Sequence, residues 1–224
     1  MRRLLWIIFG VMWLGGLVAR GVSAAHPWMA PLFLLVAAVL AVYEHAAAWQ
    51  ALFMAAVLGI AFELIGVHTG LPFGRYVYTA VLAPSVFGVP LAIGCAWLIL
   101  LDFVRGLTGS PWQGGLLMAG IDLVIDPVAA GPLRYWTWFN HGPYFGIPSV
   151  NFAGWIFASA VILTVMPQTE RRPAYVGWSV IAFFTALAFA FGMWLPALIG
   201  CVLAGLPGVR FHAQIRAQVR LALG

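Results

Sequence analysis

The sequence contains no lysine and few charged residues of any kind. Only 8% of its 224 residues are charged, against roughly 25% in an ordinary soluble domain. The 11 basic residues are all arginines, 6 residues are acidic, and 64% are hydrophobic. This shortage of charge excludes a soluble globular domain and indicates an integral membrane protein.

Cysteine is scarce as well, with 2 residues in the chain. Cys95 and Cys201 both fall in predicted membrane spans, so we expect no disulfide framework and no cysteine metal site. Their expected role is packing as small apolar side chains. The net charge of +5 is explained by membrane topology and by anionic lipid headgroups, so no nucleic-acid partner is expected.

Long apolar runs predict an all-α fold, because ~20 apolar residues are needed to cross the bilayer as a helix and a helix satisfies its own backbone. We expect residues 1–224 to form a single integral membrane domain, a polytopic helical bundle with two long aromatic-rich outer loops. About eight transmembrane helices are predicted, or seven if Gly192 and Pro196 only kink one long last helix. The eight predicted helices cover residues 4–24, 28–43, 47–67, 88–106, 113–130, 151–167, 174–191 and 193–208.

Arginine placement predicts a multi-pass protein of the cell membrane with a cytoplasmic N-terminus. Most arginines then lie inside, and Arg20, Arg75 and Arg134 lie outside. The C-terminal segment FHAQIRAQVRLALG is expected to lie on the inner leaflet as a basic amphipathic helix. The first apolar run also resembles a signal peptide with small residues at Val22-Ser23-Ala24, but Arg20 beside that point favours a retained first helix.

Acidic residues inside membrane spans are costly, so each one is a candidate functional residue. Glu63, Asp122 and Asp126 lie in the predicted third and fifth helices. Asp122 and Asp126 are four residues apart, on one helix face, and two like charges in a low dielectric force at least one of them to hold a proton. These three are candidate catalytic groups, because a protonated carboxylic acid can act as a general acid. Alternatively, they only lock helices together through hydrogen bonds.

Three other acids have simpler explanations. Asp102 lies three residues before Arg105 in the predicted fourth helix, where a local ion pair is expected, although it is kept as a further candidate catalytic residue. Glu44 is expected to lie at a membrane surface, and Glu170 to pair with neighbouring arginines in a solvated loop.

A short pattern occurs twice along the chain. An Arg-Tyr pair begins twelve residues after Glu63 and again twelve residues after Asp122, and each is followed by the tetrapeptide FGVP or FGIP. Both tetrapeptides are expected to start a helix, since proline is tolerated in the first turn. With both loops on the outer side, the two copies would be parallel and not inverted.

The two loops between acid and tetrapeptide are rich in aromatic and polar side chains. Aromatic belts lie at membrane interfaces without any chemistry, but arginine, histidine and asparagine are mixed among these residues. Aromatic faces can stabilise a substrate that becomes cationic during reaction. The candidate substrate-binding residues in the loops and the following helix are His68, Arg75, Tyr76, Tyr78, Arg134, Trp136, Trp138, Asn140, His141, Tyr144, Asn151 and Trp155.

The strings GLPFGRYVYT, FGVPLAIGCAW, IDLVIDPVA and RYWTWFNHGPYFGIPSVNFAGW together resemble the carotenoid biosynthesis membrane proteins of the bisanhydrobacterioruberin hydratase and γ-carotene 1'-hydratase type. The resemblance covers roughly residues 60–160. It implies an enzyme that adds water across the C1,C2 double bond of an acyclic ψ-end with no redox cofactor. We expect no other cofactor and no metal. The implied partners are a carotenoid drawn from the bilayer, water and membrane lipids. Other enzymes of carotenoid synthesis are a further class of partner.

Two other functions are compatible with the same residues. A Mg²⁺-dependent prenyl or lipid transferase would use the acids as metal ligands. A proton-coupled transporter would use Glu63 and Asp122 as proton relay groups.

Overall fold

A computed structural model describes residues 1–20, 28–167 and 172–223, with side chains described as far as residue 208. Eight α-helices and two short 3₁₀ helices occur in the described chain. A helix is present at the place of every predicted one. Most ends differ by a few residues, but the last helix continues 15 residues beyond the predicted end at residue 208, and the predicted end of the first helix at residue 24 lies outside the described residues. The helices are α1 Arg2–Val18, α2 Met29–Glu44, η1 Ala46–Ala48, α3 Trp49–Thr69, η2 Ala80–Leu82, α4 Leu91–Leu107, α5 Pro111–Ala130, α6 Ser149–Val165, α7 Tyr175–Ala190 and α8 Trp194–Leu223.

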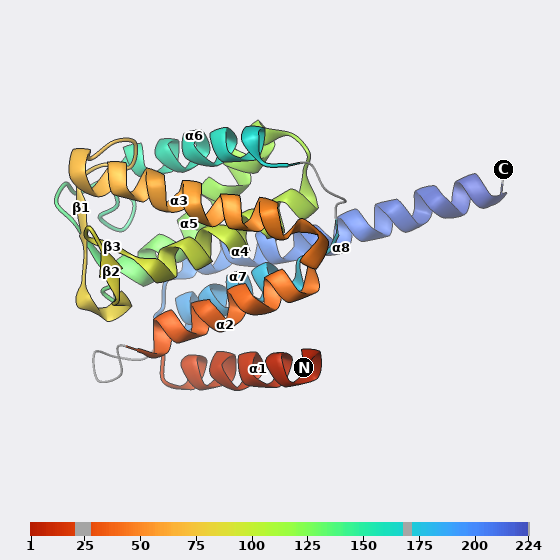
Figure 1. The fold of residues 1–224 in the computed structure, drawn as a ribbon, viewed down its shortest axis with the longest axis horizontal. Helices are drawn as coiled ribbons and strands as arrows, with labels where there is room; N and C mark the ends of the chain where they lie inside the picture. The colour runs from red at the N-terminus through yellow and green to blue at the C-terminus, as the bar shows by residue number, and fades with distance from the viewer. Residues whose placement is uncertain (21–27, 168–171, 224) are drawn as a thin grey trace.

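The last two predicted helices are separate. Gly192 has φ 71° between α7 and α8, a left-handed conformation that suits glycine, so the alternative of one bent helix is wrong. The C-terminal segment is the direct continuation of α8, which passes through Pro207 and projects away from the bundle (Figure 1). Glu170, Arg171 and the Val22-Ser23-Ala24 segment lie outside the described residues.

Two helices meet the length and composition needed to cross a membrane. They are the segment Ala46–Thr69, which contains α3, and α5. Four shorter apolar helical segments accompany them in the described chain: Met29–Glu44, Ser149–Val165, Tyr175–Ala190 and Trp194–Gly208. These apolar helices are typical of a membrane protein.

The two long loops contain short β-strands, which the all-α prediction did not include. Strand β1, Tyr76–Tyr78, pairs in antiparallel fashion with β4, Trp136–Trp138. Strand β2, Ser85–Val86, pairs with β3, Val89–Pro90. All four strands lie at one end of the bundle, which we call the strand end, and the N-terminus lies at the other (Figure 1).

The repeated tetrapeptides form the same turn. In FGVP, Phe87 has φ 49° and Gly88 has φ 83°; in FGIP, Phe145 has φ 50° and Gly146 has φ 81°. Positive φ at both central residues is the mark of a type I′ turn, the tight connection that matches the twist of a β-hairpin. The first turn joins β2 to β3, and the second closes a bridge between Tyr144 and Ile147.

The proline that ends each tetrapeptide is the N-cap of a helix. Pro90 precedes α4 and Pro148 precedes α6, both with extended backbone. Proline suits this junction because its missing N–H would have no helical partner there. The chain therefore contains two copies of one unit, helix, strand, turn and helix: α3-β1-α4 and α5-β4-α6.

The two copies are related by an approximate two-fold arrangement. Strands β1 and β4 pair about their central residues, Val77 opposite Thr137, so each copy contributes the equivalent strand to one small sheet. Both α3 and α5 run toward the strand end (Figure 1), so the copies are parallel. The helix α2 packs against α4, and α7 packs against α4 and α5.

Candidate active site

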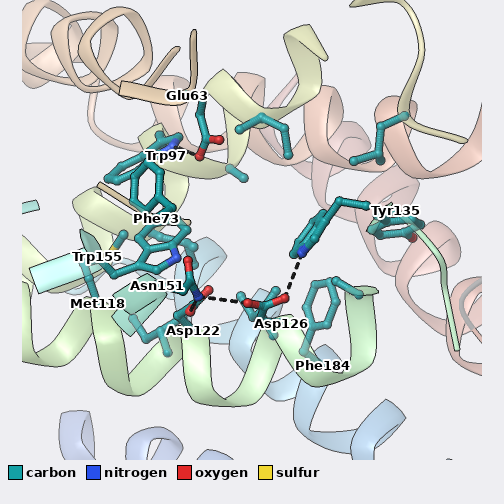
Figure 2. A pocket seen from close by; sticks show the side chains of 18 of the residues that line it. Glu63, Phe73, Trp97, Met118, Asp122, Asp126, Tyr135, Asn151, Trp155 and Phe184 are labelled. Atoms are coloured by element: carbon teal, nitrogen blue, oxygen red, sulfur yellow. Dashed lines mark hydrogen bonds between the residues drawn. The ribbon is translucent and has the colours of Figure 1, made fainter. Parts of the chain in front are cut away.

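An internal cavity of about 90 Å³ lies within the two repeated units, close to the strand end. Its wall comes mainly from α3, α4, α5, α6, β1 and β4, and it is completed by α2 and α7. The wall is apolar and aromatic except for a few polar groups (Figure 2). Nine sequence-predicted residues line it: Glu63, Tyr76, Tyr78, Asp122, Asp126, Trp136, Trp138, Asn151 and Trp155.

Glu63 of α3 is 3% exposed and accepts three hydrogen bonds. The hydroxyls of Tyr76 and Tyr78 both donate to Oε2, at 2.5 and 2.8 Å, and the indole N–H of Trp97 donates to Oε1 at 3.1 Å. Burial, with the nearby Glu63 charge as a smaller cause, raises the pKa of both phenols, so they remain protonated donors. Alternation along β1 directs Tyr76 and Tyr78 to the same face, which explains why one carboxylate receives both.

Asp126 of α5 is held in the equivalent way by the other strand. The indole N–H groups of Trp136 and Trp138 donate to Oδ1 at 2.8 and 3.2 Å, and the Asn151 amide donates to Oδ2 at 2.9 Å. An indole N–H is only a donor, so these partners match an ionised carboxylate. The repeated spacing within the sequence aligned Glu63 with Asp122, but Asp126 is the acid that receives the hydrogen bonds from β4.

Asp122 has fewer partners than either of the other acids. Among the described residues it receives one hydrogen bond, from the Asn151 amide to Oδ2 at 2.6 Å. The same amide nitrogen joins Asp122 to Asp126, and Figure 2 shows the two carboxylates side by side on α5 with Asn151 beside them. Asp122 is thus the carboxyl group with an oxygen free to carry and present a proton.

The cavity contains no basic side chain among its described lining residues. Buried carboxylates normally require paired positive charge or several hydrogen bonds, and here the hydrogen bonds come from neutral phenols, indoles and an amide. Any negative charge on these carboxyl groups is therefore solvated by dipoles, with no opposite charge beside it among the described lining residues. Such a cavity favours a positive charge that develops inside it, and its aromatic faces act in the same direction.

Five other predicted substrate-binding residues lie on the exposed surface of the strand end and outside the cavity wall: His68, Arg75, Arg134, Asn140 and His141. Tyr144 is also outside the wall, and its hydroxyl donates to the backbone carbonyl of Leu123 at 2.8 Å. That bond ties the second loop to α5 between the two aspartates.

Asp102 lies in a different polar cluster, near the end of the bundle opposite the strands. Its Oδ2 is 2.7 Å from His45 Nδ1, and its Oδ1 is 3.6 Å from Arg105. The hydrogen bond to Asp102 raises the pKa of His45, against the opposing effect of burial. Glu44 beside it pairs with Arg2 at 2.7 Å. The structure does not bring Asp102 together with the other three candidate acids.

Trp97 is a cavity residue that the sequence reasoning missed. It lies fully buried in the middle of the apolar α4, so the sequence alone suggests an ordinary core residue. Its indole N–H gave a usable signal, because a buried Trp N–H usually finds a hydrogen-bond partner. Phe73 and Tyr135 also line the cavity and were not placed among the candidate site residues.

The three acids are brought near one another without forming a recognised metal site. In the described parts of the chain, no group of three His, Cys, Asp or Glu residues is arranged to hold a metal ion. Cys95 is half-buried on α4 and Cys201 is exposed on α8, and both are free thiols.

Comparison with known proteins shows the family of the chain. Over 112 residues the chain is 29% identical to the bisanhydrobacterioruberin hydratase of Haloarcula japonica, an alignment that covers 44% of this chain and 38% of that protein. The chain thus matches well under half of that relative's length. No solved structure matches the chain. Residues 26–207, which include the whole cavity wall, match the family described as carotenoid biosynthesis protein, and the chain therefore belongs to that family.

Proposed function

We propose that the protein is a carotenoid hydratase that adds water across the terminal C1,C2 double bond of an acyclic carotenoid. The observation that carries this proposal is the unequal hydrogen bonding of the three buried acids. Two of them each accept three bonds, and Asp122 accepts one. A protonated acid beside uncompensated negative charge is what an alkene hydratase needs.

The reaction requires a proton donor first. Proton transfer to C2 leaves a tertiary cation at C1, and water then forms the new C–O bond at C1. Asp122 is the donor in this scheme, because it accepts a single hydrogen bond while the two acids nearby each accept three, and hydrogen bonds to the charged form favour ionisation of those two acids over that of Asp122. A general acid placed in this way contributes about 10²–10⁴-fold in rate.

The cation is stabilised by groups that are already in place. Glu63 and Asp126 supply negative charge from two sides, and the rings on β1 and β4 supply aromatic faces. These groups are fixed by their hydrogen bonds before the reaction begins, so little reorganisation is needed when charge develops.

The proton balance closes within the aspartate pair. Asp122 gives one proton to carbon, and the attacking water loses one proton as its oxygen bonds to C1. We assign that second proton to the Asp122/Asp126 pair, which Asn151 links through one amide nitrogen. The net change is one water added to the alkene, with no electron transferred.

This proposal includes the membrane arrangement and the partners. The eight helices would span the membrane in a multi-pass arrangement with the N-terminus in the cytoplasm, so the strand end faces outside. The substrate would arrive from the bilayer, the water from the strand end, and membrane lipids would surround the bundle. The absence of a required cofactor is part of the same proposal.

Expression in a bacterium that makes lycopene or γ-carotene tests the function. The expected product is heavier than its substrate by one water and is a tertiary alcohol, as read by mass spectrometry. If ψ-end carotenoids are present and none changes, the hydratase proposal fails. Loss of activity on chelation would instead favour a Mg²⁺-dependent transferase, and proton-coupled uptake into vesicles would favour a transporter.

A further inference from the structure

The acid cavity is too small for a whole carotenoid. An acyclic carotenoid is an extended chain comparable in length with the hydrocarbon core of a bilayer, ~30 Å, whereas the cavity has a volume of about 90 Å³. Only the reacting end of such a molecule fits beside Asp122. The rest of the polyene must extend beyond the cavity.

A second hollow adjoins one wall of the cavity. This hollow, of about 40 Å³, lies between α1, α2 and α7, and we call it the α1–α2 hollow. Leu34, Tyr135 and Phe184 line both spaces. Figure 2 shows Tyr135 and Phe184 on the side of the cavity away from Glu63, Trp97 and Trp155, so the hollow adjoins the cavity on the side away from the two tryptophans.

The chemistry of the hollow suits a flat hydrocarbon chain. Its far wall contains Met12, Met29 and Ala30, and methionine adapts its shape to irregular apolar partners. Phe33 and Phe183 face each other with ring centroids 5.2 Å apart. No charged side chain is among the described residues that line it.

Gly16 of α1 lines the α1–α2 hollow, and its lack of a side chain leaves room there. A Cβ atom added there would come 3.0 Å from Cζ of Phe183, closer than ordinary van der Waals contact. Helix α1 buries only Phe9 and Gly16 among its residues, so it is attached to the bundle through a narrow face. A polyene can pass beside such a helix into the lipid with little loss of protein packing.

We propose that the α1–α2 hollow holds the polyene body of the substrate while its terminal double bond lies at Asp122, and that the chain enters from the bilayer between α1, α2 and α7. This assignment rests on the proposed function for the identity of the occupant. It adds a binding subsite that depends on α1, which lies outside both repeated units.

The test compares two neighbouring glycines of α1. Gly16→Leu fills the hollow, and Gly15→Leu is its matched control, because Gly15 is exposed with no atom within 4 Å of an added Cβ. Each change is made alone and in an Asp122→Asn background, where the substrate binds without turnover. Binding of lycopene in detergent micelles is followed by induced circular dichroism of the polyene and by quenching of tryptophan fluorescence.

The expected result is a loss of lycopene affinity of at least about tenfold, or ~1.4 kcal/mol, for Gly16→Leu and no change for Gly15→Leu. Hydration of a short acyclic isoprenoid with the same terminal double bond should be unaffected by both. If Gly16→Leu binds lycopene as tightly as Gly15→Leu, the subsite assignment is overturned.

Poor folding of Gly16→Leu and failure of the hydratase function can each be distinguished from failure of the subsite assignment. If Gly16→Leu folds poorly, Ala30→Phe fills the same hollow from α2, with Leu32→Phe on the exposed face as its control, and unchanged lycopene binding by Ala30→Phe overturns the assignment. If lycopene binds with the expected dependence on Gly16 and no water is ever added, the subsite stands and the hydratase function fails.

Discussion

Trp97 and Trp155 stack on each other with ring centroids 4.4 Å apart and an interplanar angle of 21°. Each lies seven residues after the proline of its own tetrapeptide, Pro90 or Pro148. Equivalent residues of the two repeated units therefore meet at the centre of the bundle, as β1 and β4 do at the strand end. The candidate site lies between these two points of contact.

The proposed division of roles among the acids predicts different effects of Asp→Asn changes. Asp122→Asn should reduce hydration by about 10²-fold or more and leave the melting temperature in detergent almost unchanged, since it loses one partner. Product yield and thermal unfolding of the purified variant measure the two effects. Full activity of this variant would remove Asp122 from the mechanism.

Asp126→Asn should behave in the opposite way in the stability assay. Asparagine has an NH₂ in place of one carboxylate oxygen, and this NH₂ must face either the indole donors or the Asn151 amide. Buried donors are then left unpaired, at a cost of about 1–3 kcal/mol each. The melting temperature should fall clearly below that of Asp122→Asn. Equal melting temperatures for the two variants would contradict the hydrogen-bond assignment.

Gly59 should be intolerant of any side chain. A Cβ atom added there would overlap the ring of Trp97, displacing the indole that donates to Glu63. Gly59→Ala is expected to destabilise the protein by about 1–3 kcal/mol. The control is Gly10→Ala on α1, where no atom lies within 4 Å and the better helix propensity of alanine predicts no loss. Thermal unfolding of both should separate them.

The cluster of His45, Asp102 and Arg105 predicts a pH-dependent stability that is independent of catalysis. The folded-state pKa of His45 is raised by its bond to Asp102, and the backbone of Pro173 adds to this while burial and Arg105 oppose it. The stabilisation is thus fully present below the unfolded value of about 6.5 and is lost as the pH rises through the raised pKa.

Melting temperatures measured from about pH 5 to about pH 9 test this dependence across the range where histidine titrates. The protein should become less stable as the pH rises, and His45→Gln should flatten that part of the profile. A profile that is the same with and without His45 would show that another group is responsible.

The type I′ turns predict a stabilising substitution. Phe87 has positive φ and is 77% exposed, so its ring contributes little packing at a conformation that disfavours it. Asn-Gly is the preferred pair for this turn. Phe87→Asn should stabilise by up to about 1 kcal/mol, because asparagine adopts the left-handed conformation at a lower cost than phenylalanine, with unchanged activity. A lower melting temperature would mean that the ring makes an interaction at the membrane surface.

The helices could be predicted from the sequence because each is a single apolar run with a local signal at its ends. The pairing of β1 with β4 could not, since three-residue strands are too short to show a pattern and their partners are far apart in the chain. For the same reason Asp102 was grouped with the other acids. Its nearby Arg105 was visible in the sequence, but its closer partner His45 is 57 residues away.

The equal spacing that aligned Glu63 with Asp122 was also misleading. Strand β1 begins at Tyr76, the second residue of its Arg-Tyr pair, whereas β4 begins one residue after Tyr135. That offset, with the extra turn of α5 between Asp122 and Asp126, gives Asp126 the strand donors. Equal spacing along the chain identifies equivalent residues in two copies only where both copies have the same local geometry.

The pairing of β1 with β4 has a consequence for how this chain can change over evolution. Loops usually tolerate insertions and deletions, but here side chains alternate between the acids and the exterior, with Val77 and Thr137 facing out. A single residue gained or lost between the two aromatics of either strand would put them on opposite faces. At least one donor of a carboxylate would be lost in one step, so these surface segments should vary in composition far more freely than in length.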